Sequence, residues 1–299
     1  LNESLDFSLP EIINRLDGED GSTKLLLRTR EGLTMETVIL RYPGRVSLCV
    51  SSQVGCRLAC TFCQTGKLGF FRNLSAGQIL AQYFLAQKIC DQEDGRRISH
   101  IVFMGMGEPL DNYDHVVQAV RTFTNPEGFG LSSRHVTVST SGLVPKIRQL
   151  ATDVKASLAI SLHASNDPLR TSLMPINRRY PLAELKQSLV DYQKQTGQKL
   201  TIEYILLKDC NVEIRHAKEL VRFLHGLRAK VNLIPFNDHP GSDFGRPDDQ
   251  TIRAFQKYLS DRSIPAPVRY SKGLDVSAAC GQLAAKVAAT LQAVPSRTQ

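Results

Sequence analysis

Short apolar runs alternate with amphipathic stretches along most of the chain. The runs are rich in β-branched residues and end in turn-forming residues, which is typical of buried strands. In the stretches between them, apolar residues recur every three to four positions, which predicts helices that bury one face. The predicted strands are RVSLCVSS (45–52), HIVFMG (100–105), HVTVST (135–140), SLAISLH (157–163), LTIEYILL (200–207), KVNLIPF (230–236) and APVRYS (266–271).

Residues at the predicted helix ends support this alternation. Ser75 is suited to cap the helix that follows it. Pro181 is suited to the first turn of the helix predicted over 181–197, and Gly197 is suited to its end. Strands separated by helices predict right-handed βαβ units and a parallel sheet. About six such units are present, which favours an α/β fold of the partial (β/α)6 barrel type. A doubly wound open sheet is the competing architecture.

The same pattern suggests three parts of the chain. We expect residues 1–43 to form a short N-terminal β extension, residues 44–276 the partial barrel, and residues 277–299 a C-terminal segment with strand and helix character. In either architecture the chemistry should gather at the carboxyl ends of the strands.

Composition narrows the class of protein. The hydrophobic fraction of 42% is enough for a sizeable core, and no apolar run is long enough to predict a membrane span. The acidic first twenty residues, interrupted by Pro10, do not resemble a signal or transit peptide. Seven cysteines, an odd number, then favour a reducing compartment, and we expect a cytoplasmic location. The net charge of +8 fits either a basic soluble surface or a polyanionic partner.

Three cysteines stand close together directly after the first predicted barrel strand. GCRLACTFCQTG places Cys56, Cys60 and Cys63 in the spacing Cys-x3-Cys-x2-Cys. Thiolates are the ligands of iron–sulfur clusters, and three local ligands leave one iron of a cluster open. Phe62 would shield such a cluster from water. The alternatives are a zinc site with a distant fourth ligand, or cysteines that are close by chance.

This spacing, at the end of the first strand of a βα barrel, resembles the radical S-adenosylmethionine (SAM) superfamily. The resemblance implies one 4Fe-4S cluster held by the three cysteines, with SAM chelating the open iron. In that superfamily an electron from the cluster cleaves SAM to a 5′-deoxyadenosyl radical. The protein itself then supplies binding and orientation.

Polar residues and glycines end several of the other predicted strands. In FMGMGEPL the glycines allow close backbone approach to a ligand, and a carboxylate there can hold an ammonium. Each such residue is unremarkable by itself, but their equivalent positions at strand ends suggest one cofactor pocket. The candidate cofactor-binding residues are Gly107, Glu108, Ser139, Ser161, Leu162, His163 and Asn237.

A set of ordered motifs gives a more specific resemblance. The motifs are CVSSQVGC-x3-C-x-FC-x-T, GFFRNL, GMGEPL, STSG, SLHAS, LMPIN, NLIPFN and AACGQL. Together they resemble the RlmN family of dual-specificity RNA methyltransferases and its relative Cfr, from about residue 30 to about residue 285.

The resemblance implies roles for three further residues. Cys280, in AACGQL, would carry a methyl group taken from one SAM, and a second SAM would provide the radical that activates this methyl group. The carbon would then add to an adenine ring, and Cys49 would release the product by forming a disulfide with Cys280. Glu36, in METVIL, matches the family's general base. From the sequence alone, a structural role is favoured for Cys49 and for Cys280, and Glu36 is expected to be an exposed strand carboxylate.

The resemblance also implies the substrates and partners. GEPL and NLIPFN are closer to RlmN than to Cfr, which favours methylation of carbon 2 of an adenosine in 23S rRNA over the carbon 8 reaction of Cfr. RlmN-type enzymes also methylate the adenosine 3′ to the tRNA anticodon. The family's N-terminal helical accessory domain, thought to aid RNA binding, is not expected here, because only residues 1–34 precede METVIL. This places tRNA as a substrate in question.

The remaining expectations concern partners and competing functions. A flavodoxin-type or ferredoxin-type electron donor, a monomeric state and no membrane association follow from the resemblance. A radical enzyme acting on a small molecule or peptide is an alternative, but it would leave Cys49 and Cys280 unexplained. An iron–sulfur or zinc RNA-binding module without catalytic activity is another, and it would leave Glu108 and the other strand-end motifs unexplained.

Overall fold

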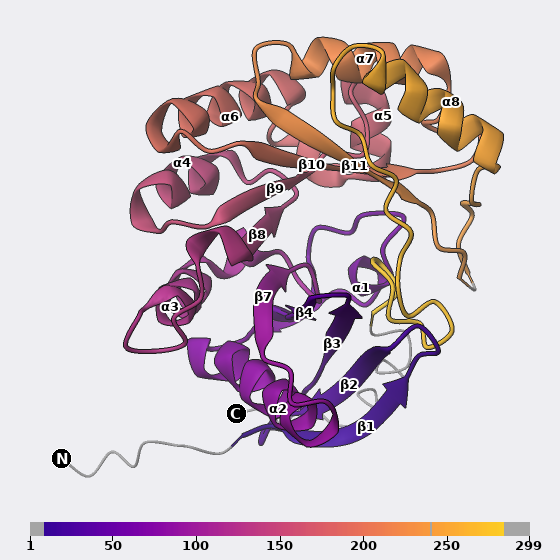
Figure 1. Cartoon of the computed structure of the whole chain (residues 1–299). Coiled ribbons are helices and arrows are strands. Elements are labelled where there is room, and N and C mark those ends of the chain that lie inside the picture. Colours follow the sequence, from indigo (N-terminus) through magenta and orange to yellow (C-terminus); the bar gives the residue numbers. More distant parts are fainter. Residues whose placement is uncertain (1–8, 240, 284–299) are drawn as a thin grey trace, which may run out of the picture.

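One nine-stranded sheet, curved around a cavity, forms the centre of the molecule (Figure 1). The computed structural model describes residues 9–239 and 241–283. The strand order is β1-β2-β3-β4-β7-β8-β9-β10-β11, antiparallel from β1 to β4 and parallel from β4 onward. These strands are β1 (Glu11–Asp17), β2 (Ser22–Arg28), β3 (Thr34–Tyr42), β4 (Arg45–Cys49), β7 (Ile98–Phe103), β8 (Val136–Thr140), β9 (Ser157–Ser161), β10 (Leu200–Leu206) and β11 (Ala229–Pro235).

Helices cover the outer face of the parallel strands (Figure 1). They are α2 (Ala76–Glu93), α3 (Tyr113–Thr124), α4 (Val144–Asp153), α5 (Asp167–Leu173), α6 (Leu182–Thr196), α7 (Ile214–Leu224) and α8 (Asp249–Ser260). Their ends follow the sequence signals. Ser75 and Gln78 form a capping box at the start of α2, and Gly197 ends α6 with a φ of 68°. Pro181 immediately precedes α6 rather than lying in its first turn.

Alternation along each strand separates the core from the cavity. On β10, Ile202 and Tyr204 are fully buried, and the Tyr204 ring packs 5.4 Å from the ring of Phe255 in α8. Thr201 and Glu203, on the opposite face, line the cavity. Because successive side chains of a strand point to opposite faces, one sequence serves both the packing of the helices and the lining of the cavity.

The six parallel strands β4, β7, β8, β9, β10 and β11 confirm the predicted partial (β/α)6 barrel. The N-terminal β extension is β1–β3, which continues the same sheet through the β3–β4 pair. Within the described residues, β1 and β11 are not paired with each other, so the barrel is open between them.

The predicted strand 266–271 is wrong in extent. The structure has only an isolated parallel bridge there, between Leu233 and Val268. Pro265 and Pro267 accept hydrogen bonds from β11 through their carbonyl oxygens but have no N–H to donate. A regular ladder therefore cannot extend through this segment.

The segment after α8 bridges the opening of the barrel. On one side, the N–H of Leu233 in β11 donates to the carbonyl of Pro267. On the other, the N–H of Gly273 donates to the Asp20 carboxylate in the β1–β2 turn (2.8 Å), and Lys24 of β2 donates to the Ser277 carbonyl (3.1 Å). From there the chain returns to the cavity, which is lined by Ala278, Ala279, Cys280, Gly281 and Leu283. The strand and helix character expected for residues 277–299 is absent from residues 277–283, which form turns and bends, and residues 284–299 lie outside the described residues.

A search of the described helices for one with the length and apolar character needed to cross a lipid bilayer finds none.

Candidate active site

A cavity of about 500 Å³ lies inside the curved sheet and gathers most of the candidate residues. Residues far apart in the chain meet there because the carboxyl ends of parallel strands share one edge of the sheet. Of the candidates, the cavity is lined by Cys49, Cys56, Cys60, Cys63, Gly107, Glu108, Ser139, Ser161, His163 and Cys280.

The loop with three cysteines is held by a small separate hairpin. Strands β5 (Gln53–Gly55) and β6 (Phe70–Asn73) pair, and the N–H of Cys56 donates to the carbonyl of Gly69 (2.8 Å). Gly55 makes this closure possible, because it has a φ of 76° and a Cβ there would lie 2.0 Å from the Gly69 oxygen. The short helix α1 (Gln64–Lys67) follows directly on Cys63.

The thiols of Cys56 and Cys60 lie in surroundings that disfavour charge. Burial raises the pKa of Cys56 to about 12, and burial followed by the neighbouring Cys63 and Cys56 raises the pKa of Cys60. Phe62 packs edge-on against the His163 ring, with centroids 4.8 Å apart, as part of an apolar cluster beside the loop. The thiols of Cys56 and Cys60 are therefore neutral until a positive charge, such as that of a metal centre, stabilises their thiolates.

Cys280 is brought to this loop by the C-terminal segment. The N–H of Gln64 donates to the Gly281 carbonyl (2.8 Å), and the Thr65 hydroxyl donates to the Leu283 carbonyl (3.2 Å). Burial, then nearby Glu203, raises the pKa of Cys280 to about 11, while Arg269 opposes the rise. The side chain is accessible because it opens into the cavity.

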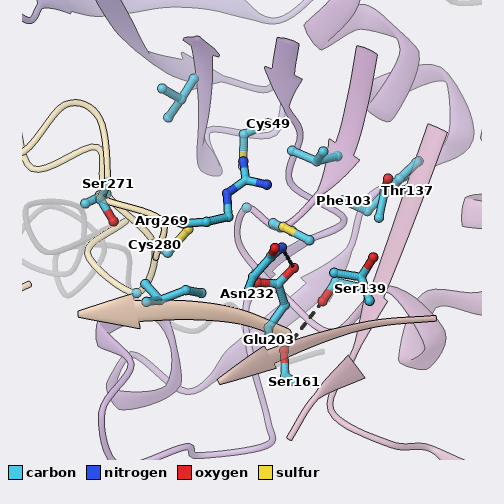
Figure 2. A pocket seen from close by; sticks show the side chains of 18 of the residues that line it. Cys49, Phe103, Thr137, Ser139, Ser161, Glu203, Asn232, Arg269, Ser271 and Cys280 are labelled. Atoms are coloured by element: carbon cyan, nitrogen blue, oxygen red, sulfur yellow. Dashed lines mark hydrogen bonds between the residues drawn. The ribbon is translucent and has the colours of Figure 1, made fainter. Parts of the chain in front are cut away.

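Cys49 approaches Cys280 from the end of β4. Burial and, to a smaller extent, the charge of Cys280 raise the pKa of the Cys49 thiol, and both residues line the cavity. Figure 2 shows the side chains of Cys49, Arg269 and Cys280 extending into the same space. Both thiols are free.

Glu108 is fixed at the edge of the cavity after β7. Its carboxylate accepts hydrogen bonds from the backbone N–H groups of Leu110 (3.0 Å) and Ser141 (2.8 Å). Burial raises its pKa, and these hydrogen bonds oppose the rise. Gly107 precedes it with a φ of 100°, and a Cβ there would lie 2.5 Å from Gln53. The turn therefore brings a buried carboxylate and a bare backbone to one point.

His163 and the two serines line the next strand ends. The Nδ1 of His163 accepts from the N–H of Ile205 (3.1 Å), and burial, then Arg170, lowers the pKa of the ring to about 3. The ring is thus neutral, with its proton on Nε2. The hydroxyl oxygens of Ser139 and Ser161 lie 3.5 Å apart.

A fully buried arginine ties these strand ends together. The guanidinium of Arg170, in α5, donates to the carbonyls of Leu162 (3.2 Å) and Ser141 (2.6 Å) and to the side chain of Asn177 (2.8 Å). Burial lowers its pKa to about 10, so it stays charged at neutral pH. It therefore acts as a fixed cation that crosslinks the loops after β8 and β9.

We predict that Arg170→Met lowers the free energy of unfolding by about 3–5 kcal/mol, because it leaves several buried acceptors without a donor. Chemical denaturation followed by circular dichroism measures this. Arg178→Met is the matched control, since Arg178 is exposed and close in sequence, and should change stability by about 0.5 kcal/mol or less. Equal effects of the two substitutions would contradict the crosslinking role.

Comparisons with known proteins agree with this geometry. A sequence model of the radical SAM superfamily matches residues 50–221. A dual-specificity RNA methyltransferase RlmN of Syntrophobacter fumaroxidans is 46% identical over 286 residues, covering 96% of this chain and 83% of that protein. The chain belongs to the RlmN family, within the radical SAM superfamily.

Other members of the RlmN family and a solved structure support the assignment. The RlmN of Pseudomonas fluorescens is 44% identical over 283 residues, covering 93% of this chain and 74% of that protein. A crystal structure of a radical SAM methyltransferase from Sphaerobacter thermophilus superposes with a TM-score of 0.91 at 46% identity, covering 93% of this chain and 82% of that one. The predicted family and fold are therefore confirmed.

Membership of the radical SAM superfamily implies SAM and a 4Fe-4S cluster, and the residues present fit both. The cluster loop offers three cysteine thiols to one cavity, and each of them would bind a different iron of a cluster. The three thiols therefore need not converge on one ion. Among the described residues, no group of side chains is placed to hold a single metal ion, which agrees with this. Glu108, Ser139, Ser161 and His163 line the same cavity and offer polar groups to a nucleoside ligand.

Three of the site residues predicted from the sequence do not line the cavity. Leu162 is buried, and both its N–H and its C=O are engaged, with Glu203 and Arg170. Asn237 reaches the cavity indirectly, by donating to the hydroxyl of Ser271 (2.8 Å). Glu36 is buried rather than exposed, and its carboxylate lies 3.3 Å from the ammonium of Lys24.

The sequence reasoning missed four residues at this site: Arg170, Glu203, Asn232 and Arg269. Glu203 and Asn232 are polar residues inside otherwise apolar strands, on the face that strand alternation directs into the cavity. Their position on the cavity-facing side of the strand alternation was the signal that could have identified them. Arg170 and Arg269 carried no such signal, because an arginine is usually a surface residue.

Proposed function

We propose that this chain methylates carbon 2 of an adenosine in 23S rRNA, and that the adenosine 3′ to the tRNA anticodon is a second substrate. One observation carries the proposal: Cys280 and Cys49 face the same cavity as the three cysteines of the cluster loop. The reaction needs a methyl carrier, a resolving thiol and a radical source within reach of one another, and this cavity contains candidates for all three.

The cavity's charge suits an RNA substrate. Among its described lining residues, two are carboxylates, Glu108 and Glu203. Five are cationic, namely Arg45, Arg134, Lys230, Arg269 and Lys272. This excess, with the net charge of +8, attracts a phosphate backbone. The target base must leave its stack to reach Cys280.

Cys56, Cys60 and Cys63 would hold the cluster, and Gly107, Glu108, Ser139, Ser161 and His163 would contact SAM directly. Asn237 would act through the Ser271 hydroxyl, and buried Leu162 would position the neighbouring His163. When bound, the cluster and SAM supply a 5′-deoxyadenosyl radical. Glu108 would orient the amino group of SAM, and Phe62 would exclude water from the cluster. Two SAM molecules per turnover are required, because one provides the methyl group on Cys280 and another the radical.

Two residues would complete the transfer of carbon to the base. The Cys49 thiolate would attack the sulfur of Cys280 in the covalent adduct, so that the S–S bond forms as the S–C bond breaks. The carbon would leave with that electron pair and take up a proton, which gives the methyl group on the base. Glu36 would remove the ring proton. It lies on β3 two residues from Val38, which pairs with Cys49, and its partner Lys24 donates to Ser277 in the Cys280 segment. The buried ion pair between Glu36 and Lys24 thereby links the proposed general base to the segment that carries Cys280.

The cellular setting follows from the chemistry. We propose a monomer in the cytoplasm, where ribosomal RNA and tRNA occur and free thiols persist. The cluster needs single electrons, which a flavodoxin-type or ferredoxin-type donor would supply. We also propose the three-part division at residues 43 and 276, with the last part carrying Cys280.

Mass spectrometry tests the proposed function. Protein co-expressed with cluster assembly factors should carry one additional methyl group on Cys280. After reaction with 23S rRNA and tRNA, nucleoside digestion should yield 2-methyladenosine. An unmodified Cys280 together with unmethylated RNA would overturn the proposal, and 8-methyladenosine would replace it with the Cfr-type reaction.

We predict that Cys49→Ala accumulates the covalent enzyme–RNA adduct, because no second thiol can release it. Denaturing gel electrophoresis with labelled RNA should show a slow band that nuclease treatment removes. Cys90→Ala, which alters a buried thiol away from the cavity, is the control and should leave no adduct. Free, methylated RNA from Cys49→Ala at the normal rate would remove Cys49 from the mechanism.

A further inference from the structure

Three polar side chains form a row across the parallel strands. Ser161 on β9 pairs in register with Glu203 on β10, which pairs with Asn232 on β11. All three line the cavity (Figure 2). Residues in register on neighbouring strands lie at the same height, so the row forms one polar shelf beside Cys280.

Glu203 and Asn232 are buried, with exposed fractions of 7% and 3%, yet each satisfies only part of the other's hydrogen-bonding capacity. The amide Nδ2 of Asn232 donates to one carboxylate oxygen of Glu203 (2.8 Å). A carboxylate can only accept, so this bond fixes which way the amide faces. The Asn232 Oδ1 is left buried with no hydrogen-bond partner.

An orphaned buried acceptor is costly, and its presence beside a cavity suggests a donor that arrives with a ligand. The second carboxylate oxygen of Glu203 adds another acceptor at this position, since only its Oε1 receives the Asn232 bond. Both residues line the cavity, so a ligand that packs against them meets two adjacent acceptors, which suit a group that carries two polar hydrogens. In adenosine these are the exocyclic amine and the ribose diol.

We propose that Glu203 and Asn232 form a subsite that receives the exocyclic amino group of the target adenine and positions the base beside Cys280. This inference rests on the proposed function. Glu203, Asn232 and Cys280 line the same cavity (Figure 2), so a base held by the first two would face the methyl carrier. The Ser161 hydroxyl, at the other end of the row, remains available to the ribose of SAM, the other source of adenosine.

The test compares two RNA hairpins in competition, one with adenosine at the target and one with purine riboside, which lacks the amine. We expect the wild-type holoenzyme to prefer adenosine by about 10- to 100-fold in kcat/KM. Asn232→Ala should reduce this preference to about twofold or less, and Glu203→Gln should reduce it in part. Any difference in intrinsic reactivity between adenosine and purine riboside is the same for wild type and variant, so it cancels when their preference ratios are compared. Because both hairpins compete in one sample, the ratio does not depend on the fraction of enzyme that is folded.

Two arms separate substrate from cofactor recognition. Equilibrium dialysis should give an unchanged SAM affinity for Asn232→Ala, and Thr201→Val, at another lining position of β10, should keep the wild-type preference. If turnover of Asn232→Ala is too low, the ratio is taken from hairpin Kd values in a Cys280→Ala background. The subsite is overturned if Asn232→Ala keeps the preference for adenosine over purine riboside, or if the wild type has no such preference. If Asn232→Ala keeps the preference but binds SAM more weakly, Glu203 and Asn232 belong to the SAM site. Wild-type protein that methylates neither hairpin contradicts the proposed function instead.

Discussion

Cys280→Ala is expected to lower RNA methylation by at least about 10³-fold, because it removes the atom that would carry the methyl group. The fold should survive, since the thiol opens into the cavity and the segment is anchored through Gly281 and Leu283. Methylation of RNA by reconstituted enzyme, quantified by nucleoside mass spectrometry, measures the loss.

The companion measurements locate the defect. The variant should retain its cluster absorbance and still cleave SAM to 5′-deoxyadenosine under reducing conditions. Cys280→Ser keeps the size of the side chain and should be equally inactive, because a hydroxyl does not replace the sulfur. Methylation by either variant within tenfold of wild type would show that the methyl group travels by another route.

Cys60→Ala is expected to remove the cluster altogether. Cys60 is one of only three local thiols, and a cluster with two protein ligands would be labile. Iron analysis of anaerobically reconstituted protein should fall from about four atoms per chain to near zero, with loss of the visible absorbance. RNA methylation and SAM cleavage should both disappear.

Cys210→Ala is the matched control for this substitution. Cys210 packs beside the same apolar cluster as Cys60 but does not line the cavity. Its replacement should leave iron content and activity close to wild type. Retention of a full cluster in Cys60→Ala, or its loss in Cys210→Ala, would mean that the ligands are assigned wrongly.

Much of the fold followed from local pattern. The six parallel strands were predicted because buried strands carry unbroken β-branched runs and the helices between them repeat every three to four residues. The strand at 266–271 was overestimated because its apolar residues suited a strand, while Pro265 and Pro267 cannot complete a ladder. Periodicity records which residues are buried and does not record which backbone groups find partners.

The candidate site divides in the same way. Cys56, Cys60 and Cys63 are close in sequence, so their spacing by itself defines one centre. Glu36 was expected to be an exposed strand carboxylate on sequence grounds alone, and only the packing of β2 against β3 shows it buried beside Lys24. Glu203 and Asn232 are unremarkable until the strand register puts them side by side.

The sequence by itself determined the class of the protein, because thiolate spacing, strand-end glycines and the order of motifs are all local properties of the chain. Only the tertiary structure decided that Cys280 shares a cavity with Cys49 and the cluster loop. They are separated by more than two hundred residues, and their meeting depends on the segment that spans the gap between β11 and the β1–β2 turn. That closure is a long-range event, and no local pattern records it.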